Sequence, residues 1–296
     1  MSYICTVMQK HIPIVDICTL SEHKEDDILV SRLSDYLREN ANMHFPHKHS
    51  FYHSVFFTAG RGSHSIDFDR FDIQTNQIYF MIPGQVHTWE FEGEMEGYVV
   101  NFSTAFFQSF LLRPDYIETF SFFAGNASGS VLNLSDEKAI SVQAAFEELV
   151  EQAHAAHVHR WDMIRILLLK ICISIEQNNN EAHTHDVTNY NYALLKNFQK
   201  LIEKNYKKLK LPMEYAELLY ITPNHLNALC KDQVGIAAGE LIRNRIILEA
   251  KRMLINKQVS ISEIAYELNF KDNSYFSKFF KKQAGISPEE FRKKSQ

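Results

Sequence analysis

The sequence contains few of the patterns that mark a special class of protein. Its four cysteines, Cys5, Cys18, Cys172 and Cys230, show no paired spacing, which argues against a disulfide framework or a cysteine metal site. The longest apolar run, 166–175, is interrupted by a lysine and is too short to cross a bilayer. No basic segment followed by an apolar one opens the chain. These absences predict buried, reduced cysteines and a soluble, cytoplasmic protein with no membrane partner.

The charge is informative only after it is divided along the chain. The 296 residues are long enough for two moderate domains, and their formal net charge is −5. Residues 1–186 carry 12 Lys and Arg against 25 Asp and Glu, whereas residues 187–296 carry 19 against 11, a net charge of +8. A basic final third is expected when only that domain meets phosphates. For any single lysine, solvation of a helix is the simpler explanation.

Alternating polar and apolar residues predict a β-rich region over 43–102. Gly, Pro, Asn and Asp separate the segments at intervals of about ten residues, which is typical of an antiparallel sandwich or barrel. We predict a small β-barrel of the jelly-roll kind. The expected strands lie at 53–57, 64–68, 77–82, 88–91 and 97–102.

Two helices are predicted after the strands, over 135–153 and 160–176, because apolar residues recur there at helical spacing. Ser135 is placed to cap the first helix. The second has an apolar stripe of Trp161, Ile164, Leu168, Ile171, Cys172 and Ile175. Because Ile166, Leu167, Leu169 and Ile173 extend apolarity to its other faces, two of its sides must be covered. One cover can be the β-rich region and the other a second copy of the chain; the alternative is a wholly intramolecular core. The expected domains are 1–178 and 191–296, joined by a polar linker at 179–190.

The most informative stretch is 261–292. Its first part has apolar residues on one helical face, and Asn269 follows where a tight turn requires a left-handed backbone. Asp272 can cap the next helix, and Gly285 can end it. Apolar positions of that helix are Tyr275, Phe276, Phe279 and Phe280. Its remaining face carries short hydrogen-bonding groups with lysines behind them, which suits base edges first and phosphates second.

These residues resemble a known family. The segments I-x-x-I-A, F-x-D-x-S-Y-F-S-K-F-F-K-K and G-x-S-P-x-x-F-R are similar to the second helix-turn-helix of AraC-type transcription regulators. One departure is Asn269, where the family usually has Gly; Asn is the next-best residue for that backbone conformation. The resemblance implies DNA contacts from Asn273, Ser274, Tyr275, Ser277, Lys278 and Lys281.

A weaker resemblance to the first helix-turn-helix of the same family follows. Pro212 is expected to begin a helix with Met213, Ala216, Leu218 and Leu219 inward, and Thr222 is placed to cap the next one. The family often has Arg at the place of Ala228 and usually has Phe at the place of Cys230, so this half should read DNA less strongly. The resemblance implies DNA contacts from Asn224, His225, Asn227 and Lys231. A long helix over 240–254 joins the two units, with Arg243 or Arg245 near the DNA backbone or bracing the domain.

Three histidines in the β-rich region form a pattern of their own. His47 and His49 are two residues apart, on one face of a strand, and His87 follows the turn P-G-Q-V. The pattern resembles the two metal-binding motifs of cupin proteins, but the metal-binding Glu of that family is absent and His53 stands near its place. Cupin-like domains of AraC-type regulators commonly have histidines that no longer hold metal. We therefore expect no cofactor, and a three-imidazole metal site remains the alternative.

Inward-facing polar and aromatic residues of the same region could surround a small molecule. The predicted effector site contains His47, His49, Arg61, His64, His87 and Trp89.

The sequence thus predicts an α+β protein with two domains: an antiparallel, cupin-like β-barrel with two helices, and an all-α domain with two helix-turn-helix motifs. The function implied by the resemblance is sequence-specific binding of double-stranded DNA by a non-enzymatic transcription regulator. Its control by an unidentified small-molecule effector and its homodimeric state are further expectations. Two alternatives are a metal-dependent cupin enzyme with a DNA-binding appendage and a DNA-binding dimer that responds to no effector.

Overall fold

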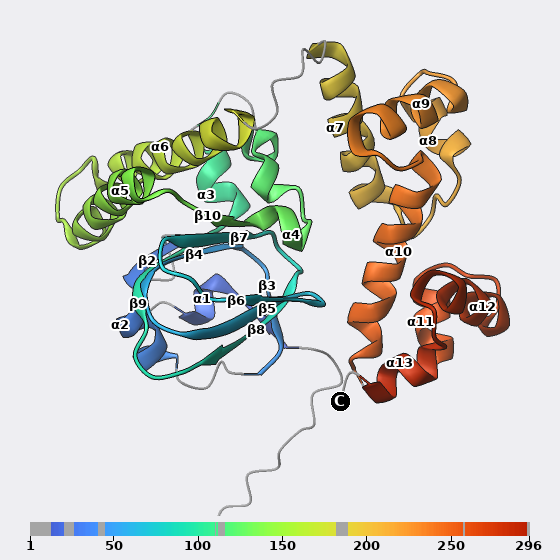
Figure 1. Ribbon diagram of the computed structural model, residues 1–296, viewed down its shortest axis with the longest axis horizontal. Helices are drawn as coiled ribbons and strands as arrows, with labels where there is room; N and C mark the ends of the chain where they lie inside the picture. The colour runs from blue at the N-terminus through green and yellow to red at the C-terminus, as the bar shows by residue number, and fades with distance from the viewer. Residues whose placement is uncertain are drawn as a thin grey trace, which may run out of the picture. The chain divides into compact units, whose positions relative to one another are not determined.

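The protein consists of two compact units, which the computed structural model describes over residues 13–20, 27–40, 45–109, 111, 116–181, 189–256 and 258–294 (Figure 1). The unit within residues 12–184, called here the β-rich unit, holds the strands; the unit within residues 185–296, called the helical unit, is built of helices alone in its described part. The predicted two-domain α+β class is confirmed. In the described residues no helix is long and apolar enough to span a membrane.

The strands of the β-rich unit form two five-stranded sheets. Sheet one has the order β1 (Ile14–Val15), β3 (His47–His49), β8 (Val86–Phe91), β5 (Gly62–Ile66) and β6 (Asp69–Asp72). Sheet two has the order β10 (Val131–Asn133), β7 (Gln77–Met81), β4 (Tyr52–Ala59), β9 (Glu96–Phe102) and β2 (Ile28–Arg32). Their pairings are antiparallel except for β1 with β3, which is parallel.

Two of the strand predictions need correction. The described strands form separate sheets and no closed barrel, because alternation of apolar residues specifies which face is buried but not whether the edge strands pair. The strand expected at 64–68 ends at Ile66, and a turn with Asp67 at φ 55° leads into the unpredicted strand β6.

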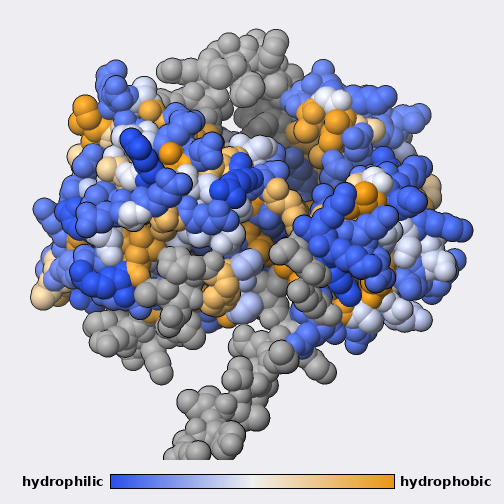
Figure 2. Space-filling view, turned by 60° about the horizontal axis from the view of Figure 1, so that its bottom comes forward, coloured by the Kyte–Doolittle hydropathy of each residue, from blue (hydrophilic) through white to orange (hydrophobic). Residues whose placement is uncertain are grey.

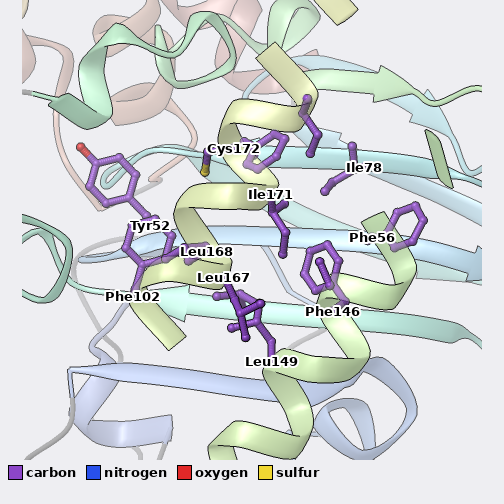
Figure 3. Close-up of a cluster of buried hydrophobic side chains, with 14 of the residues drawn as sticks. Tyr52, Phe56, Ile78, Phe102, Phe146, Leu149, Leu167, Leu168, Ile171 and Cys172 are labelled. Atoms are coloured by element: carbon purple, nitrogen blue, oxygen red, sulfur yellow. The ribbon is translucent and has the colours of Figure 1, made fainter. Parts of the chain in front are cut away.

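Sheet two is covered on both faces. Along β4, Tyr52 and Phe56 belong to the same buried cluster as helices α5 (Asp136–His154) and α6 (Arg160–Glu181), whereas Val55 and Phe57 belong to a cluster shared with Trp89 of sheet one. Successive side chains of a strand point to opposite faces, which produces this division. Figure 3 shows the helix side, with Leu168 and Ile171 of α6 and Phe146 of α5 directed at the sheet.

Both long helices begin where the sequence predicts. The Ser135 hydroxyl accepts a hydrogen bond from the Lys138 N–H at 3.4 Å, so it caps α5 as expected. The predicted stripe of α6 is buried from Ile164 to Ile175, although Trp161 is only half-buried and Leu167, expected on another face, is buried as well. The helix continues through Glu181, beyond the predicted end at 176. Most of the predicted linker lies outside the described residues.

Shorter elements complete the β-rich unit. They are α1 (Ile17–Leu20), α2 (Leu33–Glu39), α3 (Thr104–Gln108), η1 (Tyr116–Thr119), η2 (Ser121–Phe123) and α4 (Ala127–Ser130). The predicted burial of cysteines is confirmed for Cys172 and Cys230, which are free and buried; Cys5 and the side chain of Cys18 lie outside the described residues. On the face drawn in Figure 2 hydrophilic residues predominate, and hydrophobic ones form scattered patches.

Seven helices pack around one core in the described part of the helical unit. They are α7 (Asn189–Asn205), α8 (Pro212–Leu218), α9 (Pro223–Val234), α10 (Ala238–Leu254), α11 (Ile261–Glu267), α12 (Asn273–Ala284) and α13 (Pro288–Lys294). The core includes Phe198, Ile246, Phe276 and Phe280. In α8 two predicted core residues, Met213 and Leu218, are 54% and 47% exposed. Tyr215 is buried instead, with its hydroxyl donating to the Leu209 carbonyl at 3.0 Å.

Candidate nucleic-acid interface and ligand site

The helical unit contains two helix pairs, α8 with α9 and α11 with α12, joined by the same kind of turn. Tyr220 and Asn269 both have φ 55°, the left-handed conformation that reverses the chain after a helix. The next residue of each turn donates its N–H back to an alanine carbonyl, Ile221 to Ala216 at 3.0 Å and Phe270 to Ala265 at 2.9 Å. The prediction for Asn269 is confirmed, and the equivalent role of Tyr220 was not predicted.

The second helix of each pair is capped at both ends. The Thr222 hydroxyl accepts from the His225 N–H at 3.2 Å, and an Asp272 carboxylate oxygen accepts from the Tyr275 N–H at 2.7 Å. Gly235 and Gly285 end the helices with φ 78° and 79°. These caps hold the first turns of α9 and α12 in place, which is where a reading helix presents its side chains.

The two pairs lie at the positions of the two predicted motifs, and a short sequence repeat between them was not predicted. Gly-Ile-Ala at 235–237 recurs as Gly-Ile-Ser at 285–287, in each case just before the next helix. A search for self-similarity within the final third of the chain would have found it. The repeat places the predicted contact residues of α9 and α12 at equivalent positions.

Most predicted DNA contacts of α12 are accessible. Asn273, Ser274, Tyr275, Lys278 and Lys281 are exposed, and Ser277 is half-buried with its hydroxyl donating to Asn273 Oδ1 at 3.3 Å. The assignment of Tyr275 to the apolar stripe is wrong, since this side chain is 59% exposed. Exposed Lys271 and Lys282 were overlooked, although they belong to the same basic segment.

The α9 positions differ from one another. Asn224, His225 and Lys231 are exposed. Asn227 is half-buried, and its side-chain oxygen accepts from the Ala238 N–H at 3.1 Å, so it holds the start of α10. Ala228, at the place where the family often has an arginine, is exposed and has no polar side-chain atom.

Arg245 braces the domain. Its guanidinium donates to Glu203 at 2.8 Å and Glu249 at 3.1 Å and lies 3.9 Å from the centre of the Tyr206 ring. Burial lowers its pKa, but the two carboxylates outweigh burial and the pKa is raised above its ordinary value. The side chain is therefore a permanent cation inside an ion-pair network.

In the β-rich unit the three predicted histidines lie together. His47 pairs with His87 across β3 and β8, and His49 lies two residues along the same strand face. The His87 Nε2 atom is 2.9 Å from His47 Nε2 and 2.6 Å from His49 Nε2. All three side chains are buried, and desolvation lowers their pKa values, so the neutral imidazole is favoured.

Further polar groups lie next to these rings. His53 Nδ1 lies 2.6 Å from Asn101 Oδ1, and His53 Nε2 lies 2.9 Å from the Tyr79 hydroxyl. The Trp89 indole N–H donates to that hydroxyl at 2.9 Å. Burial lowers the pKa of His53 to about 3. The sequence reading noted His53 only as the residue standing near the missing glutamate.

The remaining predicted effector residues are divided between the interior and the surface. His64 is buried, with its Nε2 atom 3.2 Å from Gln77 Oε1, and burial lowers its pKa to about 4. Trp89 is buried in the core between the sheets. Arg61 is exposed in the connection between β4 and β5, so the structure does not bring it into the buried cluster. A surface hollow, which was not predicted, lies between α3 and α6 and is lined by Phe107, Leu111, Arg165 and Leu169.

Comparison with known proteins matches both units. Residues 35–169 match the family described as AraC-like ligand binding domain, and residues 215–294 match the family described as helix-turn-helix domain. The HTH-type transcriptional activator RhaR of Mannheimia succiniciproducens is 21% identical over 290 residues, which cover 94% of this chain and 97% of RhaR.

Two further similarities are partial or distant. The uncharacterized transcriptional regulatory protein YesN of Bacillus subtilis is 36% identical over 106 residues, so the match covers 34% of this chain and only 29% of that relative's length. Among solved structures, ToxT of Vibrio cholerae is 15% identical, with 90% of this chain and 97% of ToxT covered and a TM-score of 0.42.

Proposed function

We propose that the chain is an AraC-type transcription regulator, which binds promoter DNA sequence-specifically and is controlled by an effector in its β-rich unit. The observation that carries the proposal is the repeated arrangement of left-handed turn, capped helix and exposed polar face in α9 and α12. We propose that these two helices are the reading helices of two helix-turn-helix motifs.

The side chains of the two helices fit different parts of the duplex. Asn224 and Asn273 lie in the first turns of α9 and α12, where amide groups can bond the edges of adenine. Lys231 and Lys281 lie in the last turns, where ammonium groups can bond phosphates. Two such helices in successive major grooves would be separated by about 34 Å and would read one long asymmetric site.

A mobility-shift titration of the full chain on genomic promoter fragments tests the proposal. We expect retention of a subset of fragments, with an affinity that falls steeply as the salt concentration rises, because phosphate contacts release counterions. Lys278→Ala should weaken retention, whereas Lys170→Ala on α6, also exposed, serves as the matched control and should not. Absence of binding to every fragment at low salt contradicts the proposal.

For control of DNA binding, we propose that the cupin-like β-rich unit binds a small molecule and pairs with a second copy of the chain. The support is the match to a ligand-binding family and the outer face of α6, where Ile166 is 46% exposed and Leu169 and Ile173 are half-buried. An effector that binds one conformation more tightly would shift the population competent for DNA. We propose a cytoplasmic, non-enzymatic role, in keeping with relatives named as regulators.

A further inference from the structure

The connection between α7 and α8, residues 206–211, is bonded to both helix pairs of the helical unit. On one side it is held by α8, the first helix of the first pair. The Glu214 carboxylate accepts from the Lys210 N–H at 2.8 Å and from the Leu211 N–H at 2.7 Å. The buried Tyr215 side chain donates its hydroxyl to a carbonyl of the same connection at 3.0 Å. The connection is therefore fixed to the first pair.

On its other side the Lys210 ammonium contacts the second pair. Its Nζ atom donates to the Leu268 carbonyl at 2.8 Å and lies 4.8 Å from the centre of the Phe270 ring. Leu268 is the C-cap of α11, where the helix dipole attracts a cation, and an aromatic face attracts one as well. Phe270 is buried, and its ring centre lies 5.3 Å from that of Phe276 and 5.1 Å from that of Phe279 in α12. Lys210 thus holds the turn on which α12 rests.

A second contact between the same parts is weaker. Lys207 Nζ lies 2.5 Å from Glu267 Oε1, but the two side chains are 43% and 55% exposed, and exposed ion pairs contribute little to stability. Lys210 is half-buried and donates to two carbonyls, those of Leu268 and of Lys207, the latter at 2.9 Å. Hydrogen bonds from a charged donor are among the stronger ones. Lys210 is therefore the main link between the connection and the second pair.

The internal repeat shows that a helix pair can be built without this lysine. Glu214 and Glu263 occupy the same place in α8 and α11, and each accepts from the backbone N–H of the residue before its helix. Four residues before Glu263 stands Val259, at the place that Lys210 has before Glu214. Valine has no donor to offer. The lysine is an addition to the first pair that reaches across to the second.

A contact of this kind determines how the two pairs are oriented. The covalent link between them is α10, which runs from one pair to the other (Figure 1). Helices bend, so a second contact away from the α10 axis restricts bending and twisting between the pairs. Along B-DNA one base pair changes the position of a half-site by about 3.4 Å and its direction by about 35°. A small change in orientation would therefore alter which spacing of half-sites the chain can read.

The geometry points to Lys210 as a positioning residue that fixes the spacing at which the two helix pairs read DNA. Its Nζ atom is bound to protein carbonyls, so it acts through the turn between α11 and α12 and not through a contact with the duplex. The link between the pairs stands on the contacts alone, and its meaning for DNA rests on the function proposed for α9 and α12.

Distances between two spin labels in the full chain test the link without DNA. Labels are attached to Ala228→Cys of α9 and Lys282→Cys of α12, two exposed positions, in a chain whose Cys5 and Cys18 are replaced by serine; Cys172 and Cys230 are buried. Pulsed electron paramagnetic resonance should give one narrow distance. Lys210→Met keeps the length of the side chain and removes the ammonium. It should raise the share of other distances about tenfold, because a hydrogen bond from a charged group is lost.

A matched control comes from the same connection. Lys208→Met removes the same charge from an exposed neighbour and should leave the narrow distance unchanged. The inference is overturned if Lys210→Met gives the distance distribution of the parent chain, or if Lys208→Met broadens it equally. Should Lys210→Met lose its helical circular dichroism, Lys210→Gln, which removes the charge and retains an N–H donor, takes its place under the same criteria.

Selection from a pool of random DNA duplexes tests the consequence for reading. Sequences retained by the wild-type chain should share two half-sites at one spacing. Lys210→Met should retain the same half-sites, with the preference for that spacing lowered about tenfold, whereas Lys208→Met should keep it. The same single spacing for Lys210→Met overturns its role in DNA reading. If the wild-type chain retains no sequence, the proposed function fails, and the label distances still decide whether Lys210 links the pairs.

Discussion

Asp272 accepts a hydrogen bond from the Tyr275 N–H at 2.7 Å and so fixes the first turn of α12. Asp272→Ala removes this cap and should lower the free energy of unfolding of the helical unit by about 1 kcal/mol. Asp272→Asn keeps an accepting oxygen and should retain most of the stability. Urea denaturation followed by circular dichroism measures both; equal loss in the two variants would show that the carboxylate charge, not the cap, is responsible.

Asn269 adopts a backbone conformation that disfavours a Cβ substituent without a local hydrogen-bonding group. Asn269→Ala should destabilise the helical unit by about 1 kcal/mol, whereas Asn269→Gly should be close to neutral or stabilising. Thermal unfolding of the full chain provides the comparison. Tyr220→Gly is the matched change in the other turn, where φ is also 55° and the side chain is 96% exposed. If Asn269→Ala is as stable as the wild type, the turn is not under the strain inferred here.

Much of the α11–α12 region could be predicted because its determinants are local. A cap, a left-handed residue and a terminal glycine each act within one turn of backbone, so Asn269, Asp272 and Gly285 could be identified from their neighbours alone. Predictions based on the apolar stripe were less reliable for short helices. The helix α8 has only about two turns, so contacts with other elements decide which of its faces is buried. Met213 and Leu218 were therefore assigned to the wrong side.

Long-range pairing could not be predicted in the same way. Alternating residues identified most strands, but the division into two sheets depends on which strands bond across distant parts of the chain. The spacing of His47, His49 and His87 indicated a common site, and the antiparallel register of β3 with β8 then brings the rings together. Nothing in the sequence indicated that the Asn227 side chain would accept a hydrogen bond from the first residue of α10, because that contact is tertiary.

Phe146 anchors α5 to sheet two, with ring centres 5.6 Å from Phe56 and 5.4 Å from Tyr98. Phe146→Ala should destabilise the β-rich unit by about 3–5 kcal/mol, because it removes buried area and leaves a cavity. Ile140→Ala on the same helix is the control: this side chain is 71% exposed, and its loss should change stability by about 0.5 kcal/mol or less. Chemical denaturation of both variants checks the contrast, and similar losses would contradict the assigned packing.

Asn273 and Lys281 should affect DNA binding in different ways. Asn273→Ala should cost about 1–3 kcal/mol on the preferred sequence and little on unrelated DNA, because a base contact is lost. Lys281→Ala should weaken binding to all sequences alike and reduce the slope of log K against log salt by about 0.9, the value for one phosphate contact. Fluorescence anisotropy on specific and random duplexes at several salt concentrations measures both. Identical behaviour of the two variants would contradict the division between reading and phosphate contacts.

Ile166 is a large apolar side chain on the outer face of α6 and is 46% exposed, while Ile164 and Leu167 beside it are buried against the sheet. If a second copy covers this face, Ile166→Glu places a charge in an apolar interface and should raise the dimer dissociation constant by about tenfold or more, since an unpaired buried charge costs several kcal/mol. The monomer should remain folded, because the substituted position is already partly solvated. Val158→Glu, at a site 90% exposed in the connection between α5 and α6, controls for added charge and should leave association unchanged. Sedimentation equilibrium over a range of protein concentrations distinguishes the outcomes. A wild-type chain that stays monomeric, or an Ile166→Glu chain that associates as strongly as the wild type, would exclude this face as the contact between copies.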